Sequence, residues 1–227
     1  MEKKPKDLVS QFFDNTASSY DFIVKWTTFG KDNYWKEEII KKIPSTSNSI
    51  LELACGTGIL TKKIAENFPN SRIVGVDITE TYLNIAKKRT RSLPNVIYIF
   101  EDAEKINLNE KFDCITSSYI PKYCDVKILI EKCLKHLKPN GIIILHDFLY
   151  PKNHLFQKIW KFYFKLLKVL GNFIPEWKNV FIELPKLIEH SAWIEDFENT
   201  MKKNNILVEK QILTWRTAGI LSGRKII

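Results

Sequence analysis

The residues best suited to bind a ligand lie in the run Cys55-Gly56-Thr57-Gly58, between an apolar strand pattern and a helical pattern. Such strand-to-helix turns bind nucleotide-like ligands at the carboxyl edge of parallel sheets. Gly56 and Gly58 lack a Cβ, so the backbone can come close to a bound molecule. The run has two of the three glycines of a dinucleotide fingerprint and no Lys-Ser or Lys-Thr ending for phosphate. Glu52, four residues before Gly56, instead favours S-adenosylmethionine (SAM), which has a cationic amino acid end and no phosphate.

A second acidic residue, Asp77, ends the next predicted strand, nineteen residues after Gly58. An acidic residue at about this distance accepts hydrogen bonds from ribose hydroxyls in sheets of this kind. The neighbouring Ile78 would offer an apolar surface to one face of an adenine ring. Asp77 also precedes Thr79 and a predicted helix, so it could instead cap that helix. We favour ribose binding.

The following two strands also end in polar residues. Asp102 and Ala103 come after the third strand, where the carboxylate can accept the adenine amino group and the backbone N–H of Ala103 can donate to a ring nitrogen. The alternative is that Asp102 only closes a turn. Ser118 closes the fourth strand, beside the expected position of the methionine part. Together, the four strand ends predict a SAM site at one sheet edge.

Strands and helices alternate along the chain from residue 49, which is typical of a doubly wound α/β sheet. Strands are predicted at 49–53, 72–76, 96–100, 112–117, 141–146, 207–215 and 218–224. Helices are predicted at 59–67, 80–91, 125–137 and 194–203, with Lys138-Pro139-Asn140-Gly141 as the stop of the third. The expected fold is therefore α/β, a mostly parallel seven-stranded sheet with N-terminal helices and a helical insertion after the fifth strand.

A length of 227 residues fits one domain, which we predict to span 1–227. Within it we expect four parts. They are a helical N-terminal cap at 1–48, a SAM-binding core at 49–150, a helical substrate cover at 151–190, and a C-terminal helix and strand pair at 191–227.

The centre of the insertion, residues 154–170, has a helical pattern with one basic stripe formed by Lys158, Lys161, Lys165 and Lys168. Apolar residues occupy most of the remaining surface, which is too wide a face for a helix that merely lies on a protein. The helix could cover a lipophilic substrate while its lysines meet solvent or anionic headgroups. Alternatively, it is an ordinary packed helix with a solvated lysine edge.

The composition of the chain bears on its partners and on its place in the cell. The net charge of +9 either favours an anionic partner, such as nucleic acid or a lipid surface, or serves only solvation. No run approaches the roughly 20 apolar residues of a membrane span, and no apolar signal core follows the charged N-terminus. We expect a cytoplasmic protein with peripheral membrane contact through 154–170. The four cysteines show no paired or zinc-binding spacing, so we expect reduced thiols and no metal.

Taken together, these motifs resemble the class I SAM-dependent methyltransferases, and within them the ubiquinone/menaquinone-biosynthesis C-methyltransferase family. The segment Phe13-Asp14-Asn15-Thr16-Ala17-Ser18-Ser19-Tyr20-Asp21 is similar to that family's N-terminal Phe-Asp…Ala…Tyr-Asp signature. Further similar segments are Phe29-Gly30, Trp35-Lys36, 112–116, 137–141, 148–153 and 213–224. The resemblance spans nearly the whole chain and implies a Rossmann-like fold with SAM as the cofactor.

The resemblance also implies individual cofactor contacts, at Thr61, Asp77, Asp102, Ala103 and Ser118, with Glu52, Gly56 and Gly58 matching the glycine turn. Two departures fall on the substrate side. The family has Asn a few residues after its Tyr-Asp pair, where this chain has Val24 or Lys25. The family's Phe-Gly-Leu-Arg-Asn run reads Tyr119-Ile120-Pro121-Lys122-Tyr123 here, which points to an altered aromatic acceptor.

The expected activity is C- or O-methyl transfer from SAM to a small, aromatic, lipophilic, quinone-like acceptor. A base would help to deprotonate a phenolic acceptor. His146, at the end of the fifth strand and beside Asp147, is the candidate, although it could equally be a core histidine satisfied by backbone. Tyr20 and Tyr119 are candidates for positioning the acceptor.

Three alternatives remain open from the sequence. The basic charge would suit an RNA or protein methyltransferase. Against this alternative, the chain shows no RNA-binding module and no Asn-Pro-Pro-Tyr-type motif, so nucleic acid is not the expected partner. The fold could also bind SAM without catalysis, or belong to a nucleotide-dependent oxidoreductase. The sequence does not determine the oligomeric state.

Overall fold

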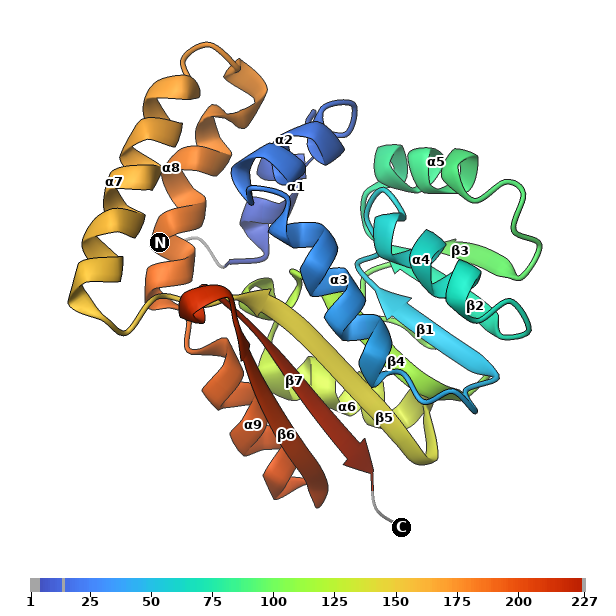
Figure 1. Cartoon of the computed structure of the whole chain (residues 1–227). Coiled ribbons are helices and arrows are strands. Elements are labelled where there is room, and N and C mark those ends of the chain that lie inside the picture. Colours follow the sequence, from blue (N-terminus) through green and yellow to red (C-terminus); the bar gives the residue numbers. More distant parts are fainter. Residues whose placement is uncertain (1–4, 14, 226–227) are drawn as a thin grey trace.

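The structure is a computed structural model, and it describes residues 5–13 and 15–225. Asp14 of the N-terminal signature lies outside the described residues. Seven strands in these residues form one sheet, in the order β3-β2-β1-β4-β5-β7-β6 (Figure 1). The strands are β1 (Ser49–Leu53), β2 (Arg72–Asp77), β3 (Val96–Phe100), β4 (Phe112–Ser118), β5 (Leu137–Phe148), β6 (Ile206–Leu213) and β7 (Ala218–Lys225). Strand β7 is antiparallel to both of its neighbours, β5 and β6, and the other pairs are parallel. The predicted doubly wound, mostly parallel sheet is therefore confirmed.

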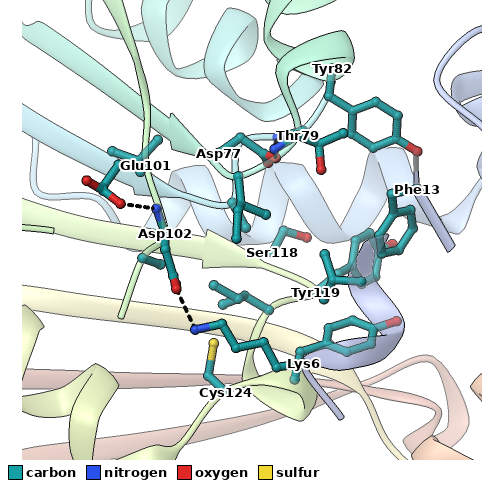
Figure 2. Close-up of a pocket in the computed structure, with 18 of the residues that line it drawn as sticks. Lys6, Phe13, Asp77, Thr79, Tyr82, Glu101, Asp102, Ser118, Tyr119 and Cys124 are labelled. Atoms are coloured by element: carbon teal, nitrogen blue, oxygen red, sulfur yellow. Dashed lines mark hydrogen bonds and ion pairs between the residues drawn. The ribbon is translucent and has the colours of Figure 1, made fainter. Parts of the chain in front are cut away.

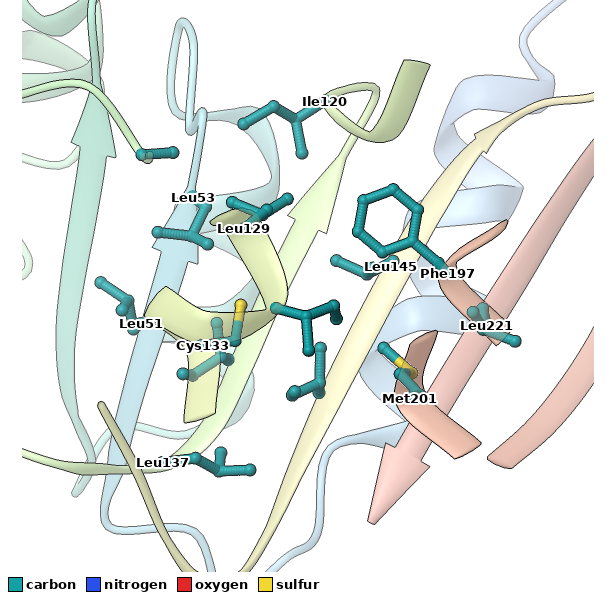
Figure 3. Packing of buried hydrophobic residues seen from close by; sticks show 14 of the residues in the cluster. Leu51, Leu53, Ile120, Leu129, Cys133, Leu137, Leu145, Phe197, Met201 and Leu221 are labelled. Atoms are coloured by element: carbon teal, nitrogen blue, oxygen red, sulfur yellow. The ribbon is translucent and has the colours of Figure 1, made fainter. Parts of the chain in front are cut away.

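Helices cover both faces of the sheet. The core helices are α3 (Lys31–Lys42), α4 (Ile59–Asn67), α5 (Glu80–Arg89), α6 (Val126–His136) and α9 (Trp193–Lys203). Every residue of β1 is buried, and its apolar side chains point alternately to the two faces. Ile50 packs with residues of α3 and α4, whereas Leu51 and Leu53 pack with residues of α6 and α9. Figure 3 shows part of this second cluster, in which Phe197 and Met201 of α9 lie near Leu145 and Leu221 of the sheet.

The strand order reverses between β1 and β4, because β2 and β3 lie on one side of β1 and β4 and β5 on the other. Ligands of open α/β sheets bind at the carboxyl ends of the strands at such a reversal. The Ser117 hydroxyl donates to the Leu53 carbonyl at 2.6 Å and ties these two strand ends together. The predicted SAM-site residues therefore follow strands that meet at one edge.

A helical cover lies beyond this edge (Figure 1). It consists of α1 (Asp7–Phe13), α2 (Tyr20–Thr27) and a hairpin of α7 (His154–Leu170) and α8 (Pro175–His190). A third apolar cluster joins these elements to the short helix η1 (Pro121–Tyr123), and it contains Phe12, Ile23, Tyr123, Leu167, Trp177 and Phe181. The predicted helix at 154–170 is α7, and α8 completes the helical insertion.

Two boundaries differ from the sequence prediction in ways that matter. The stop at Lys138–Gly141 does not separate a helix from a strand, because β5 already begins at Leu137 opposite Phe112. The residues between Leu137 and Ile142 form an irregularity in the strand, with Asn140 at φ 61°. The strand predicted to run to Trp215 ends at Leu213. The next three residues form the turn η2 (Thr214–Arg216). All three have positive φ, and a strand cannot continue through residues in this conformation.

Candidate functional site

The first cavity, which we call the edge pocket, lies over the carboxyl ends of β1 to β4 (Figure 2). Six of the predicted cofactor residues line it: Gly56, Asp77, Ile78, Asp102, Ala103 and Ser118. Glu52, Gly58 and Thr61 are not among its lining residues. The charged groups around the pocket are Asp77, Glu101, Asp102 and a single lysine, Lys6. An acidic lining of this kind suits a cationic ligand and disfavours phosphate.

The Asp77 carboxylate is buried and holds the glycine turn in place. Its Oδ2 accepts the backbone N–H of Gly56 at 2.7 Å, and its Oδ1 accepts that of Thr79 at 2.8 Å. Burial raises the pKa of Asp77, although these hydrogen bonds act in the opposite direction. Asp77 therefore joins the turn after β1 to the turn after β2. A carboxylate has about four acceptor sites on its two oxygens, so Asp77 is of the right type to accept hydrogen bonds from a ligand as well.

The two glycines of the turn have different surroundings. Gly56 has φ 56° and lines the edge pocket, and a Cβ built on it would meet only Tyr82, at 3.8 Å. Gly58 has φ 77°, and a Cβ there would lie 2.8 Å from the Cβ of Ala86 on α5. Gly56 thus leaves room toward the pocket, whereas Gly58 permits close packing of the turn against α5.

Glu52 and Thr61 bind each other next to the turn. The Thr61 hydroxyl donates to Glu52 Oε2 at 2.5 Å, and both residues are buried. Burial raises the pKa of the Glu52 carboxyl to about 8. The cofactor contacts predicted for these two residues, and for Gly58, remain predictions. In the structure Glu52 and Thr61 bind each other next to the turn, and Gly58 packs the turn against α5.

Asp102 is held by a lysine from the N-terminal segment. Lys6 Nζ donates to Asp102 Oδ2 at 2.6 Å (Figure 2). It also pairs with Glu104. The Asp102 carboxylate, predicted to accept an adenine amino group, thus already carries an ion pair through Oδ2. A ligand that uses this oxygen must share it with Lys6, which can keep its contact with Glu104.

A second, larger cavity of about 480 Å³ lies between α2, α7 and α8, and we call it the apolar cavity. Its walls include Val24, Trp35, Phe148, Trp160, Phe164 and Leu184. Four aromatic residues line both cavities, and we call them the junction: Phe13, Tyr20, Tyr119 and Tyr123. The predicted positioning residues Tyr20 and Tyr119 therefore lie where the two cavities meet. Burial raises the pKa of both hydroxyls well above its usual range, so neither tyrosine is a base near neutral pH.

Tyr119 is fixed from several directions. It has φ 74°, its hydroxyl donates to Asp32 Oδ1 at 2.7 Å, and its ring stacks on Phe148 with 4.8 Å between centroids. A bulky residue in the left-handed region is uncommon and persists only where its surroundings hold it. Such conformations cluster at binding sites, and this one lies at the junction.

The predicted base, His146, is fully buried and lines neither cavity. Its Nδ1 lies 2.9 Å from the Ser118 hydroxyl, and its ring packs against Trp35 and Tyr119. Its Nε2 has no hydrogen-bond partner among the described residues. Burial lowers the pKa of the imidazole well below its usual value, so the ring is neutral. This geometry favours a core histidine, but its imidazole contacts the Ser118 side chain and not the backbone that the alternative expected.

Lys122, which the sequence analysis did not single out, lines the apolar cavity next to the junction. Its Nζ donates to Asp147 Oδ1 and to the Tyr119 carbonyl, both at 2.7 Å, and lies 4.4 Å from the centroid of the Tyr123 ring. Lys122 and Asp147 are both buried, and burial lowers the pKa of the lysine and raises that of the acid. A signal existed in the sequence, because these opposite charges follow the fourth and fifth predicted strands, which pair with each other in the structure.

Comparison with known proteins identifies relatives over nearly the whole chain. The sequence model of the ubiE/COQ5 methyltransferase family matches residues 1–222. The ubiquinone/menaquinone biosynthesis C-methyltransferase UbiE of Rickettsia akari (strain Hartford) is 30% identical over 210 residues, which are 88% of this chain and 85% of that protein. The demethylmenaquinone methyltransferase of Chlorobaculum tepidum is 27% identical over 213 residues, 89% of this chain and 85% of that one.

Solved structures share the fold. The plantazolicin methyltransferase BpumL in complex with SAH has a TM-score of 0.66 at 14% identity and covers 97% of this chain and 95% of its own. The N-methyltransferase NodS from Bradyrhizobium japonicum WM9, in complex with S-adenosyl-L-homocysteine (SAH), has a TM-score of 0.61 at 16% identity, with 87% of each chain covered. At these identities the likeness concerns the fold alone.

Proposed function

Because the chain belongs to the ubiE/COQ5 methyltransferase family, and is therefore a SAM-dependent methyltransferase, we propose that its acceptor is a small, lipophilic, quinone-like aromatic molecule. Relatives named for ubiquinone, menaquinone and demethylmenaquinone support this acceptor class. The observation that carries the proposal is the junction, where an acidic pocket at the sheet edge meets a large apolar cavity. One cavity suits a cationic cofactor, and the other suits an acceptor with a ring and an apolar tail.

For SAM, the edge pocket offers groups of the right kind. Asp77 would accept hydrogen bonds from the ribose, and the exposed Ile78 would lie against one adenine face. Gly56 allows the backbone to approach, and Ser118 ends β4 beside the junction. The carboxylates around the pocket complement the positive charge of the sulfonium and ammonium groups. These residue assignments are part of the proposal.

For the acceptor, the apolar cavity offers a long aromatic and aliphatic lining with few polar groups. Such cavities bury apolar ligands and use a small number of polar side chains to fix their orientation. The polar groups nearest the junction belong to Tyr20, Tyr119, Lys122 and Tyr123. The polar ring of the acceptor would therefore lie at the junction, with its apolar tail among α7 and α8.

When bound, SAM supplies an electrophilic methyl group on a sulfonium. The protein contributes alignment of the acceptor carbon or oxygen with that methyl, together with exclusion of water by the aromatic junction. Lys122 carries positive charge beside the place proposed for the acceptor ring. In a buried site this ammonium would stabilise an acceptor that binds in its deprotonated form, after its proton has passed to solvent, and Asp147 holds the ammonium in position.

A lipophilic acceptor resides in a membrane, so we propose that the protein collects it at a membrane surface. No helix in residues 5–13 and 15–225 has the length and apolar character needed to cross a bilayer. Contact would therefore be peripheral, as expected for the helical insertion.

The acceptor class is tested by incubating the protein with methyl-labelled SAM and a cell extract, followed by separation of lipid, RNA and protein. We expect the label in the organic phase, on a compound with a quinone ring. Label that is found in RNA or protein instead would overturn the proposal. A boiled protein sample and a sample without extract are the controls.

The role of Lys122 is tested by the double variant Lys122→Met/Asp147→Asn, which removes both buried charges and so avoids leaving one of them unpaired. We expect kcat to fall by about 100-fold or more, with SAM affinity nearly unchanged. Lys127→Met, on the exposed side of α6, is the matched control. An unchanged kcat in the double variant would exclude Lys122 from the reaction.

A further inference from the structure

Helix α7 carries apolar side chains on two opposite sides. Trp160, Phe164 and Leu167 face inward and line the apolar cavity. A second set repeats every three or four residues, which places it along one outward line of the helix. We call this set the outer stripe; it consists of Leu155, Ile159, Phe162, Leu166 and Val169, all of them exposed. Leu155 is 65% exposed and Phe162 is 62% exposed, so neither packs against the protein.

The outer stripe is bordered by positive charge. Lys158, Lys161, Lys165 and Lys168 lie along one flank of α7, and the helix contains no acidic residue. Lys161 pairs with Glu189 of α8 at 2.8 Å. The other three lysines are exposed and form no ion pair with any described residue. The surface thus combines an apolar ridge with uncompensated basic side chains.

The mouth of the apolar cavity continues this surface. Ile159 belongs to the outer stripe and also lines the cavity, and its neighbour Phe156 lines the cavity while remaining partly exposed. Across the mouth lie Phe29, between α2 and α3, and Trp215 of η2, which stacks on Phe156. Both are more than 70% exposed although they line the cavity, at 77% and 75%. The exposed apolar surface therefore leads directly into the cavity.

We propose that the outer stripe and its lysine flank form a docking surface for an anionic lipid bilayer. The apolar side chains would insert at the boundary between headgroups and acyl chains, and the lysines would bind anionic headgroups. In this orientation the cavity mouth faces the bilayer, so the acceptor can enter without crossing water. This last consequence rests on the acceptor class proposed above, whereas docking itself does not.

A second copy of the chain is the other candidate to cover the outer stripe. Pairing of two α7 helices would bring two lysine-rich flanks together without any acidic residue of α7 to balance them, and like charges repel at such a contact. An anionic lipid surface complements the same charges. Charge therefore selects the bilayer over self-association.

Docking is tested by co-sedimentation of the full chain with two kinds of vesicle, without SAM or acceptor. One is pure phosphatidylcholine, and the other contains phosphatidylglycerol at about one lipid in three. We expect binding to the anionic vesicles to be at least tenfold stronger and to weaken with salt. Equal binding to both, or to neither, would overturn the proposal.

Two variants locate the surface. Phe162→Gln/Leu166→Gln removes apolar side chains that line neither cavity, and Lys165→Gln/Lys168→Gln removes two charges. Each is expected to weaken vesicle binding by about tenfold or more. The matched controls are Leu207→Gln on β6 and Lys87→Gln/Lys88→Gln on α5, which are exposed elsewhere and should bind as the wild type does.

Two further measurements separate this proposal from its premise. Methyl transfer to a water-soluble, short-chain quinol should be unchanged in Phe162→Gln/Leu166→Gln, so a loss of docking and a wrong acceptor give different results. Light scattering of the protein without vesicles reports self-association. A dimer that is dissociated by Phe162→Gln would assign the outer stripe to a second copy and overturn lipid docking.

Discussion

Individual residues at the sheet edge divide into those that face the cavities and those that support them. Asp77 and Gly56 belong to the first group and are joined by a hydrogen bond of 2.7 Å. Glu52, Thr61 and Gly58 belong to the second group. Glu52 and Thr61 bind each other next to the turn, and Gly58 packs against Ala86 of α5. Substitutions in the first group should therefore lower the affinity for a ligand, whereas substitutions in the second group should lower the stability of the fold.

The two glycines give the sharpest test of this division. Gly58→Ala combines an unfavourable φ with a 2.8 Å approach to Ala86, and should lower the free energy of unfolding by roughly 3 kcal/mol. Gly56→Ala has an unfavourable φ but open space around the new Cβ, and should lower the free energy of unfolding by about 1 kcal/mol. Because Gly56 lines the edge pocket, the same change should weaken SAM binding by at least about tenfold. Urea unfolding and calorimetric titration with SAM measure the two effects. Equal stability losses in the two variants would contradict the assignment.

Glu52 predicts a dependence of stability on pH. Its carboxyl has a pKa of about 8 in the folded protein and an ordinary value of 4.5, so between these pH values the folded state binds more protons than the unfolded state. The free energy of unfolding should therefore fall as pH rises from about 4.5 to 8, by up to roughly 5 kcal/mol from this group. Urea unfolding at several pH values should show a flatter profile for Glu52→Gln. Parallel profiles for variant and wild type would show that Glu52 is ionised throughout.

At the scale of elements, helix α7 of the cover buries fewer side chains than helix α6 of the core. Helix α6 packs into the cluster under the sheet through Leu129, Ile130 and Cys133, all fully buried. Helix α7 has one fully buried residue among those described, Leu167, and is otherwise half-buried or exposed. Elements with few buried contacts open more readily than core elements. Helix α7 should therefore open more readily than α6, as entry of the proposed acceptor would require.

Capping residues allow this difference to be measured. Asn153 caps α7 by accepting the backbone N–H groups of Leu155 and Phe156, and Asp125 caps α6 by accepting those of Lys127 and Ile128. Each substitution by alanine should cost about 1 kcal/mol at its own helix. Asn153→Ala should mainly speed hydrogen exchange in the first turn of α7, by about fivefold, whereas Asp125→Ala should lower global stability. Hydrogen-exchange mass spectrometry and urea unfolding distinguish the two. The idea of a separately opening cover would be wrong if Asn153→Ala lowered global stability equally.

At the scale of the whole molecule, the sheet and the helical cover each form part of the site. The sheet edge builds the edge pocket, and α2, α7 and α8 enclose most of the apolar cavity. The junction draws Phe13 and Tyr20 from the N-terminal segment and Tyr119 and Tyr123 from the region after β4. Arg89 of α5 pairs with Asp21 of α2, and Asp21 also accepts the Thr57 hydroxyl of the glycine turn at 2.7 Å. Cover and core are thus linked beside the turn.

This division predicts that the apolar cavity can be blocked without a change in SAM affinity. Leu184→Trp places a larger side chain in the apolar cavity and should lower acceptor turnover by at least about tenfold, with SAM affinity within about twofold of the wild type. Leu187→Trp, on the same helix but lining neither cavity, should retain turnover. Steady-state kinetics and SAM titration check both variants. Loss of SAM binding in Leu184→Trp alone would show that the two cavities do not act separately.

Much of this arrangement was readable from the sequence. The alternation of strands and helices predicted the parallel sheet, because strands buried on both faces must be apolar and must be separated by crossover helices. The same topology predicted that the polar residues at the strand ends meet at one edge. Six of the nine predicted cofactor residues line the edge pocket. Local patterns sufficed there, because parallel strands have their carboxyl ends at the same edge of the sheet.

Other features were decided only by tertiary packing. Glu52, Gly58 and Thr61 are close in sequence to pocket residues, but they face Ala86 or each other, and side-chain direction at a turn depends on what packs behind it. The pairing of Lys6 with Asp102, the burial of His146 and the place of Lys122 beside the junction all join segments distant in the chain. The sequence by itself determined the sheet, the glycine turn and the methyl donor, because these depend on local periodicity and short motifs. Tertiary structure decided which side chains face the cavities and how the cover encloses the apolar cavity, because these depend on contacts between elements that no local pattern encodes.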